Sequence, residues 1–102
     1  MRKITADIQT AIHNQSTFKG ANTLITANVR EDGFKVMSVY LHGHLVAQCG
    51  RSGWGFCFAG YPTATTRDRI NAVRGAVGLP LVGFVKGVPT VEGKAVPVND
   101  WF

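Results

Sequence analysis

Two histidines and two cysteines carry the side chains in this sequence that hold metal ions most readily. His42, His44, Cys49 and Cys57 together would suit tetrahedral zinc, which prefers imidazole nitrogen and thiolate sulfur. Zinc sites usually take their ligands as close pairs from two knuckles, whereas these cysteines stand singly and the histidines span a turn. We therefore expect no bound metal and no other cofactor, with both cysteines as small core residues.

Nucleophilic catalysis would need one of those cysteines beside a histidine that a third group orients. No carboxylate is near enough in sequence to do this, because Glu31 and Asp32 fall in the first expected turn. Acid–base catalysis by paired carboxylates is disfavoured too, since Glu92 reads as a turn residue and Asp68 as part of a helix cap. With no complete catalytic set, we expect that the protein is not an enzyme.

Residues 50–55, GRSGWG, form a glycine-rich segment that could cradle a phosphate beside Arg51. The segment lacks the Lys-Ser/Thr pair of a phosphate-binding loop, and its spacing differs from a dinucleotide fingerprint. A strand is expected after it instead of a helix, so no helix dipole would face an anion. We interpret the segment as a hairpin loop that displays Arg51.

Aromatic residues at every second position of one expected strand can be interpreted in two ways. Trp54, Phe56 and Phe58 share one strand face, with Tyr40 available from a neighbouring strand. Beside arginines, such a row could stack the bases of single-stranded nucleic acid. The same period is typical of a strand that faces the core, and we favour the core. For the terminal pair Trp101 and Phe102, we favour packing of the tail onto the core over an exposed anchor.

A polar stripe on the second expected helix is the main candidate for a binding surface. Arg67, Asn71 and Arg74 recur at i, i+4 and i+7, and we expect them to face solvent opposite the apolar residues of that helix. Guanidinium groups there could contact acidic residues of a protein or the phosphates of nucleic acid. Together with Arg51, these residues form the predicted binding site.

The elements that position these residues can be read from periodicity and turn signals. Residues 3–14 show a helical apolar stripe, and residues 20–29, 34–41, 44–49 and 54–59 read as strands joined by glycine turns. The first turn, Asp32-Gly33, predicts type I′ geometry. Thr65 is the expected N-cap of a helix in which Ile70, Val73 and Val77 face the sheet and which Pro80 stops.

After Pro80, residues 81–85 read as a strand and residues 91–94 as a last hairpin turn. The fold class that follows is α+β: an antiparallel β-meander sheet with two helices packed on one face, in the order α-β-β-β-β-α-β-β. A chain of 102 residues fits a single domain, residues 1–102.

Composition limits the classes of partner and the cell compartment that we expect. Eleven Lys and Arg against six Asp and Glu give a formal net charge of +5, which suits nucleic acid, acidic proteins and anionic lipid alike. No apolar run is long enough for a membrane span, and residues 1–12 do not resemble a signal peptide. We expect reduced thiols, a cytoplasmic setting and no membrane partner. The sequence leaves the oligomeric state open.

Two segments resemble a known group. Residues 40–47, YLHGHLVA, and residues 59–71, AGYPTATTRDRIN, are similar to an LHG-x-x-(I/V)A hairpin and a TT-x-x-R-(I/L)-N helix start in small accessory proteins of tailed bacteriophages. The likeness covers roughly residues 22–80. Tyr61 stands where that group carries tryptophan. The resemblance implies a phage origin and the host cytoplasm, and it assigns no catalytic residue.

Two functions remain open from the sequence. The first is a non-catalytic phage accessory protein that binds and modulates a host protein, such as a defence, replication or transcription factor. The alternative is a small basic module that contacts single-stranded DNA or RNA. Scattered charge without a catalytic set favours the first.

Overall fold

The first helix begins and ends where its apolar stripe predicts. The computed structural model describes residues 3–102, and α1 spans Lys3–Asn14. Ile8, Ala11 and Ile12 are its buried residues. Gln15 follows with a left-handed φ of 52°, and Ser16 N donates to Ala11 O at 2.9 Å. This closing bond satisfies a carbonyl of the last turn and stops the helix.

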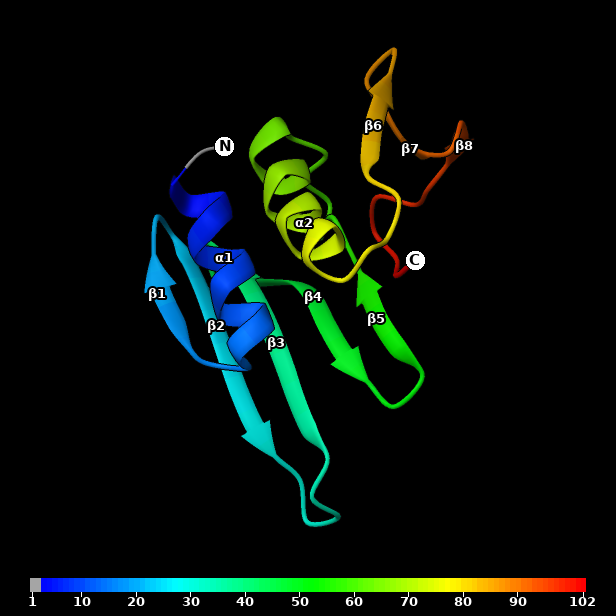
Figure 1. The fold of residues 1–102 in the computed structure, drawn as a ribbon. Helices are drawn as coiled ribbons and strands as arrows, with labels where there is room; N and C mark the ends of the chain where they lie inside the picture. The colour runs from blue at the N-terminus through cyan, green and yellow to red at the C-terminus, as the bar shows by residue number, and fades with distance from the viewer. Residues whose placement is uncertain (1–2) are drawn as a thin grey trace.

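A five-stranded antiparallel sheet follows, with its strands side by side in chain order (Figure 1). The strands are β1 (Phe18–Gly20), β2 (Thr23–Val29), β3 (Lys35–Leu41), β4 (His44–Gly50) and β5 (Gly53–Phe56). The predicted meander is confirmed, with one strand more than expected and with β5 ending three residues early. Each strand pairs with its chain neighbour because only short turns separate them.

The additional strand is β1, which the sequence reading missed. Ala21 and Asn22 form the turn between β1 and β2, and both have positive φ, 50° and 58°. Asparagine adopts this conformation readily, but alanine does so rarely, so residues 20–29 read as one uninterrupted strand.

The Asp32-Gly33 turn forms a hairpin, but its expected type I′ geometry is wrong. Only Gly33 has positive φ, at 84°, whereas Asp32 does not. Gly33 N donates to Arg30 O at 2.9 Å, and Asp32 Oδ1 accepts from Phe34 N at 3.0 Å. These bonds describe a three-residue loop that ends in a left-handed glycine. His42 and Gly43 at the next hairpin both have positive φ, 51° and 81°.

A bulge shapes the centre of β4. Val39 pairs with Ala47 and Tyr40 pairs with Leu45, which leaves Val46 as an extra residue. Val46 and Ala47 are therefore both buried, although neighbours along a regular strand face opposite sides. On the other side of β4, Val46 O accepts from Cys57 N at 2.9 Å, which extends the pairing with β5 by one residue.

The second helix, α2 (Ala64–Ala76), starts earlier than expected. Thr63, not Thr65, is its N-cap, and Thr63 Oγ1 accepts from Thr66 N at 3.2 Å. The predicted capping box with Asp68 is therefore wrong, because Thr65 already lies inside the first turn. Gly78 ends the helix with a φ of 78°, and Leu79 N donates to Arg74 O at 2.8 Å.

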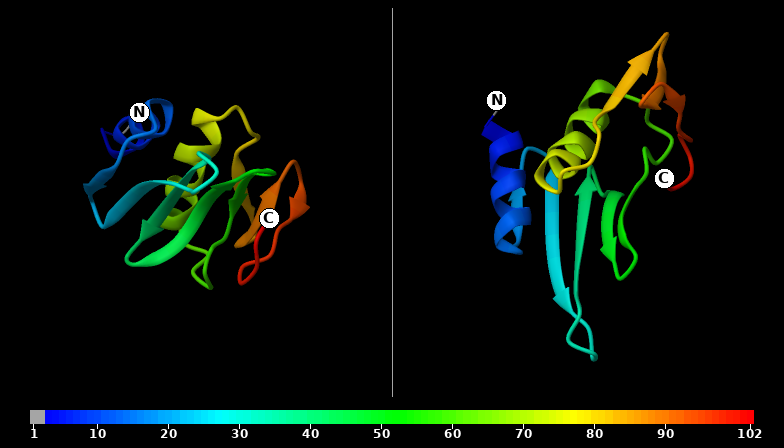
Figure 2. Two further views of the ribbon diagram at one scale, coloured as in Figure 1. Left: turned by 90° about the horizontal axis from the view of Figure 1, so that it is seen from below. Right: turned by 45° about the vertical axis from the view of Figure 1, so that its right-hand side comes forward.

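Both helices cover the same face of the five-stranded sheet, as predicted (Figure 2). The core lies between this face and the helices, and Ile70 and Val73 of α2 are fully buried in it. Its sheet side is built from alternate strand residues, as the pleat requires, except that the β4 bulge adds two neighbouring residues. These strand residues are Ile25, Met37, Val39, Leu41, Val46, Ala47 and Phe56.

The last three strands form a separate antiparallel sheet instead of joining the meander. They are β6 (Val82–Val85), β7 (Val88–Val91) and β8 (Lys94–Ala95), and they lie beside α2 on the side away from α1 (Figures 1 and 2). The predicted strand at residues 81–85 and the turn at Glu92-Gly93 are confirmed. A second turn, Lys86-Gly87, was not predicted.

Neither helix within residues 3–102 is long and apolar enough to cross a membrane.

Candidate binding surfaces

The polar stripe of α2 faces the second sheet instead of solvent. Asn71 makes two hydrogen bonds with the backbone of Val82: its Nδ2 donates to the carbonyl at 2.9 Å, and its Oδ1 accepts from the N–H at 2.7 Å. The side-chain amide thus occupies the outer edge of β6 as a neighbouring strand would. Asn71 holds the second sheet against the helix.

Arg74 is buried, with 7% of its surface exposed. Its guanidinium carbon lies 4.9 Å from the ring centroid of Phe56 and 5.8 Å from that of Phe102. Its Nε donates to Pro80 O at 2.5 Å. Burial lowers the pKa of this guanidinium from its usual value, and the Glu92 carboxylate partly offsets the change. A cation in this position stacks the α2, β5 and C-terminal segments together.

Arg67 keeps part of its side chain in solvent, 32% by surface. Its guanidinium carbon lies 5.0 Å from the ring centroid of Phe84, and its Nη2 approaches Asp68 Oδ1 at 3.4 Å. The expectation of a free, solvent-facing stripe is therefore wrong for Asn71 and Arg74 and only partly right for Arg67. Their role in binding a partner stays a prediction.

Helical geometry explains why the stripe on α2 does not face solvent. Arg74 follows Ile70 by four residues, and residues at this spacing lie on the same side of a helix. The stripe therefore adjoins the apolar face instead of opposing it, and the chain after Pro80 folds back over it.

Arg51 is the most exposed of the predicted site residues, with 60% of its side chain accessible. It forms an ion pair with Asp32 and places its guanidinium carbon 5.0 Å from the Phe34 ring centroid. The hydrogen bond from Arg51, followed by one from Phe34 N, holds the pKa of Asp32 below its usual value. Arg51 therefore ties the β4–β5 loop to the β2–β3 loop, and within residues 3–102 no hydrogen bond, ion pair or ring contact joins it to the α2 stripe.

The aromatic row belongs to the core, as favoured. Phe56 and Phe58 are 1% and 0% exposed, and Trp54 stacks on Phe56 with ring centroids 6.3 Å apart. Phe102 joins them: it exchanges two backbone hydrogen bonds with Phe56, at 2.9 and 3.0 Å, and stacks on Phe58 at 6.0 Å. The packed tail is confirmed for Phe102, while Trp101 stays 43% exposed and lies over Gly55.

The two histidines and the buried cysteine differ in exposure. His42 in the β3–β4 turn and His44 at the start of β4 are exposed, whereas Cys57 is buried and its Sγ accepts from Ala59 N at 3.3 Å. Burial raises the pKa of the Cys49 thiol. Within residues 3–102, the structure brings together no group of three or more His, Cys, Asp or Glu side chains that could hold a metal.

A cavity of about 450 Å³ opens between the β3–β4 turn and the start of α2, and we call it the turn cavity. The two segments that carry the phage resemblance, residues 40–47 and 59–71, meet here and supply most of its wall. Its lining residues are Leu41, His42, His44, Val46, Phe58, Tyr61, Thr63, Thr65 and Thr66. The sequence did not predict that these residues lie together, because only tertiary packing brings the two segments into contact.

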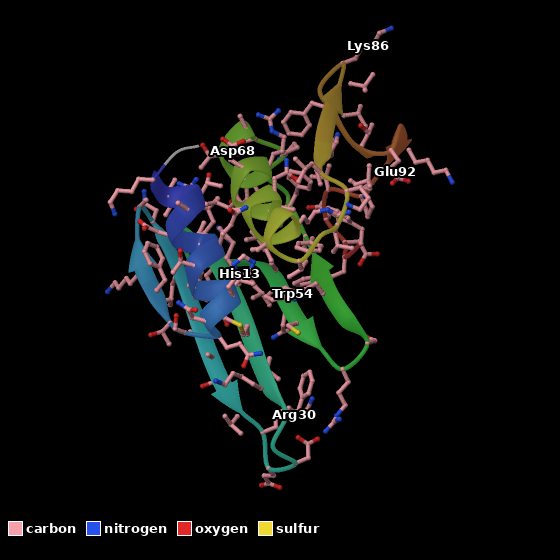
Figure 3. All side chains as sticks on the ribbon, in the orientation of Figure 1. His13, Arg30, Trp54, Asp68, Lys86 and Glu92 are labelled. Atoms are coloured by element: carbon pink, nitrogen blue, oxygen red, sulfur yellow. The ribbon has the colours of Figure 1, made fainter. Side chains whose placement is uncertain are left out.

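The β6–β7 hairpin presents an apolar face to solvent. Leu81, Val85 and Val88 are 58%, 57% and 46% exposed, and we call these three residues the hairpin face. Val85 pairs directly with Val88 across the turn. The hairpin projects from the body of the protein, with Lys86 pointing outward at its tip (Figure 3). The Lys86-Gly87 pair between Val85 and Val88 is the sequence signal that could have revealed this hairpin.

Comparison with known proteins gives one result. The family model described as Kyanoviridae Gp96 protein matches residues 1–102. No curated protein and no solved structure matches the chain.

Proposed function

The chain belongs to the Kyanoviridae Gp96 protein family, and we propose that it binds and modulates a host protein. The proposal starts from its being a phage protein. We place this action in the host cytoplasm and assign it no catalytic step. The contact that we propose is the hairpin face, Leu81, Val85 and Val88. The experiment below tests the contact and the class of partner separately.

The exposed hairpin face is the observation that carries the proposal. Its three aliphatic side chains are each about half exposed, while Val82 on the other side of the same strand is 3% exposed. The inner face of the strand is therefore packed against the protein, whereas its outer apolar face is exposed to solvent. Burying such side chains against a partner releases their hydration water, which is the main favourable contribution to protein association.

The arginines of the predicted site support the choice of a protein over nucleic acid. Arg74 is buried, and Arg51 and Arg67 pair with Asp32 and Asp68. Binding to nucleic acid depends on cations that are free to neutralise phosphates, and each internal partner weakens that contact. The net charge of +5 keeps nucleic acid as the alternative partner. In that case Arg51 and Arg67, the arginines of the predicted site with exposed side chains, would make the contact.

The proposal is tested by capture from nuclease-treated lysate of infected host cells. The tagged protein is compared with the double variant Val85→Glu with Val88→Glu, which places two charges in the apolar face. We expect the double variant to lose a host protein that the unmodified chain retains. Titration with that purified host protein should then show a dissociation constant raised about a hundredfold, the size of a two-residue hot spot.

Val29→Glu is the matched control. Val29 is 66% exposed at the end of β2, so it tests the effect of adding charge to another exposed valine. Capture of the same host protein by the double variant and by the unmodified chain would remove the hairpin face from the interface. If material is retained from untreated lysate, is lost after nuclease treatment and returns with added single-stranded DNA, the nucleic-acid alternative replaces the proposal.

A further inference from the structure

The turn cavity has the dimensions and chemistry of a small-molecule site. Its volume of about 450 Å³ lies within the usual range of ligand pockets, roughly 300–1,000 Å³. Leu41, Val46 and Phe58 form its apolar side, and they are 4%, 1% and 0% exposed. These residues are held by β3, β4 and the segment that leads to α2, so this part of the wall is fixed by the core itself.

Aromatic rings form a second part of the wall. His44 and Tyr61 are both exposed, and their ring centroids lie 5.0 Å apart with the ring planes tilted by 40°. Tyr61 exposes 52% of its surface. An exposed pair of this kind can stack a flat ring, because every heteroaromatic base has a π face.

The polar wall can donate hydrogen bonds to an anionic group. His42, His44 and Thr65 contribute imidazole and hydroxyl groups, and among residues 3–102 no acidic side chain lines the cavity. The first turn of α2 lies on the same wall, and the positive end of its dipole favours negative charge. The cavity therefore combines an apolar floor, a stacking wall and a polar rim without negative charge.

We propose that the turn cavity binds a nucleotide. The base lies against the His44–Tyr61 pair, and the phosphate lies at the rim beside His42 and Thr65. A free mononucleotide and a single nucleotide of a DNA or RNA strand share this chemistry. This binding is independent of the hairpin face, and the two proposals can fail separately.

The test is a titration of the full chain followed by NMR of its backbone amides and side chains. The probes are the four nucleoside monophosphates, inorganic phosphate and a short oligo-dT. We expect at least one mononucleotide to shift the signals of His42, His44 and Thr65. Phosphate alone should produce no comparable shifts, because it lacks the stacking contact. An oligo-dT that binds more tightly than dTMP would identify the strand as the source.

Three variants sharpen the test. Tyr61→Ala should weaken binding about tenfold or more, the size of one stacking contact, whereas Tyr61→Phe should retain it. Tyr40→Ala is the control. Tyr40 lies on β3, where it pairs with Leu24 of β2 and Leu45 of β4, and it does not line the cavity. The amide spectrum of each variant verifies that it is folded. Absence of shifts at the cavity with every nucleotide at millimolar concentration, or equal shifts with phosphate alone, would overturn the proposal.

Discussion

The side-chain amide of Asn71 pairs with both backbone groups of Val82, at 2.7 and 2.9 Å, and so completes the outer edge of β6. We expect Asn71→Ala to lower the free energy of unfolding by about 1–3 kcal/mol, because a buried N–H and a buried carbonyl lose their partners. Chemical denaturation measures the loss. Asn28→Ala, at an exposed position on β2, should change stability by less than about 0.5 kcal/mol. Equal effects of the two substitutions would contradict this role for Asn71.

Phe102 closes the aromatic core from the end of the chain. Phe102→Ala should destabilise the protein by about 2 kcal/mol, because it removes a partly buried ring that contacts Phe56, Phe58 and Arg74. Thermal unfolding should show this as a lower melting temperature. Trp101→Ala should cost less, since Trp101 is 43% exposed. A larger effect at Trp101 than at Phe102 would be inconsistent with the packing described.

Val73 lies at the centre of the core with 0% of its surface exposed. Val73→Asp should unfold the domain, because an unpaired buried carboxylate costs several kcal/mol out of the roughly 5–15 kcal/mol that stabilise a small protein. Circular dichroism and amide spectra would detect the loss of structure. Val29→Asp introduces the same group at a position that is 66% exposed, and this variant should stay folded. A folded Val73→Asp protein would mean that the assigned face of α2 is wrong.

Arg51 and Asp32 give a prediction that depends on pH. The hydrogen bond from Arg51 holds the pKa of Asp32 below its ordinary value of 3.8. Since the pKa is lower in the folded state, the ion pair contributes its stability above pH 3.8 and loses it as the pH falls through the folded-state value. Arg51→Gln should raise the pKa of Asp32, although the bond from Phe34 N remains. NMR titration of the Asp32 carboxyl carbon measures the change, and an unaltered pKa in the variant would exclude Arg51 as its main cause.

Local sequence determined much of the architecture. The bounds of α1, the paired left-handed residues of the His42-Gly43 turn, and the burial of Ile70 and Val73 all follow from short-range patterns. Helical periodicity and turn chemistry act over only a few residues, so a linear sequence displays them directly. The same patterns placed the aromatic row in the core. They failed at Ala21-Asn22, where an alanine occupies a conformation that its side chain disfavours.

Only the tertiary structure decided the environment of Arg67, Asn71 and Arg74. Periodicity identified the stripe that they form on α2, but the residues that cover it come from β6 and from the end of the chain. The turn cavity and the exposed hairpin face arise in the same way, from segments that meet or separate on folding. A side chain's exposure depends on which distant segment packs against it. That packing is set by the sum of many weak contacts across the domain, which no local pattern contains.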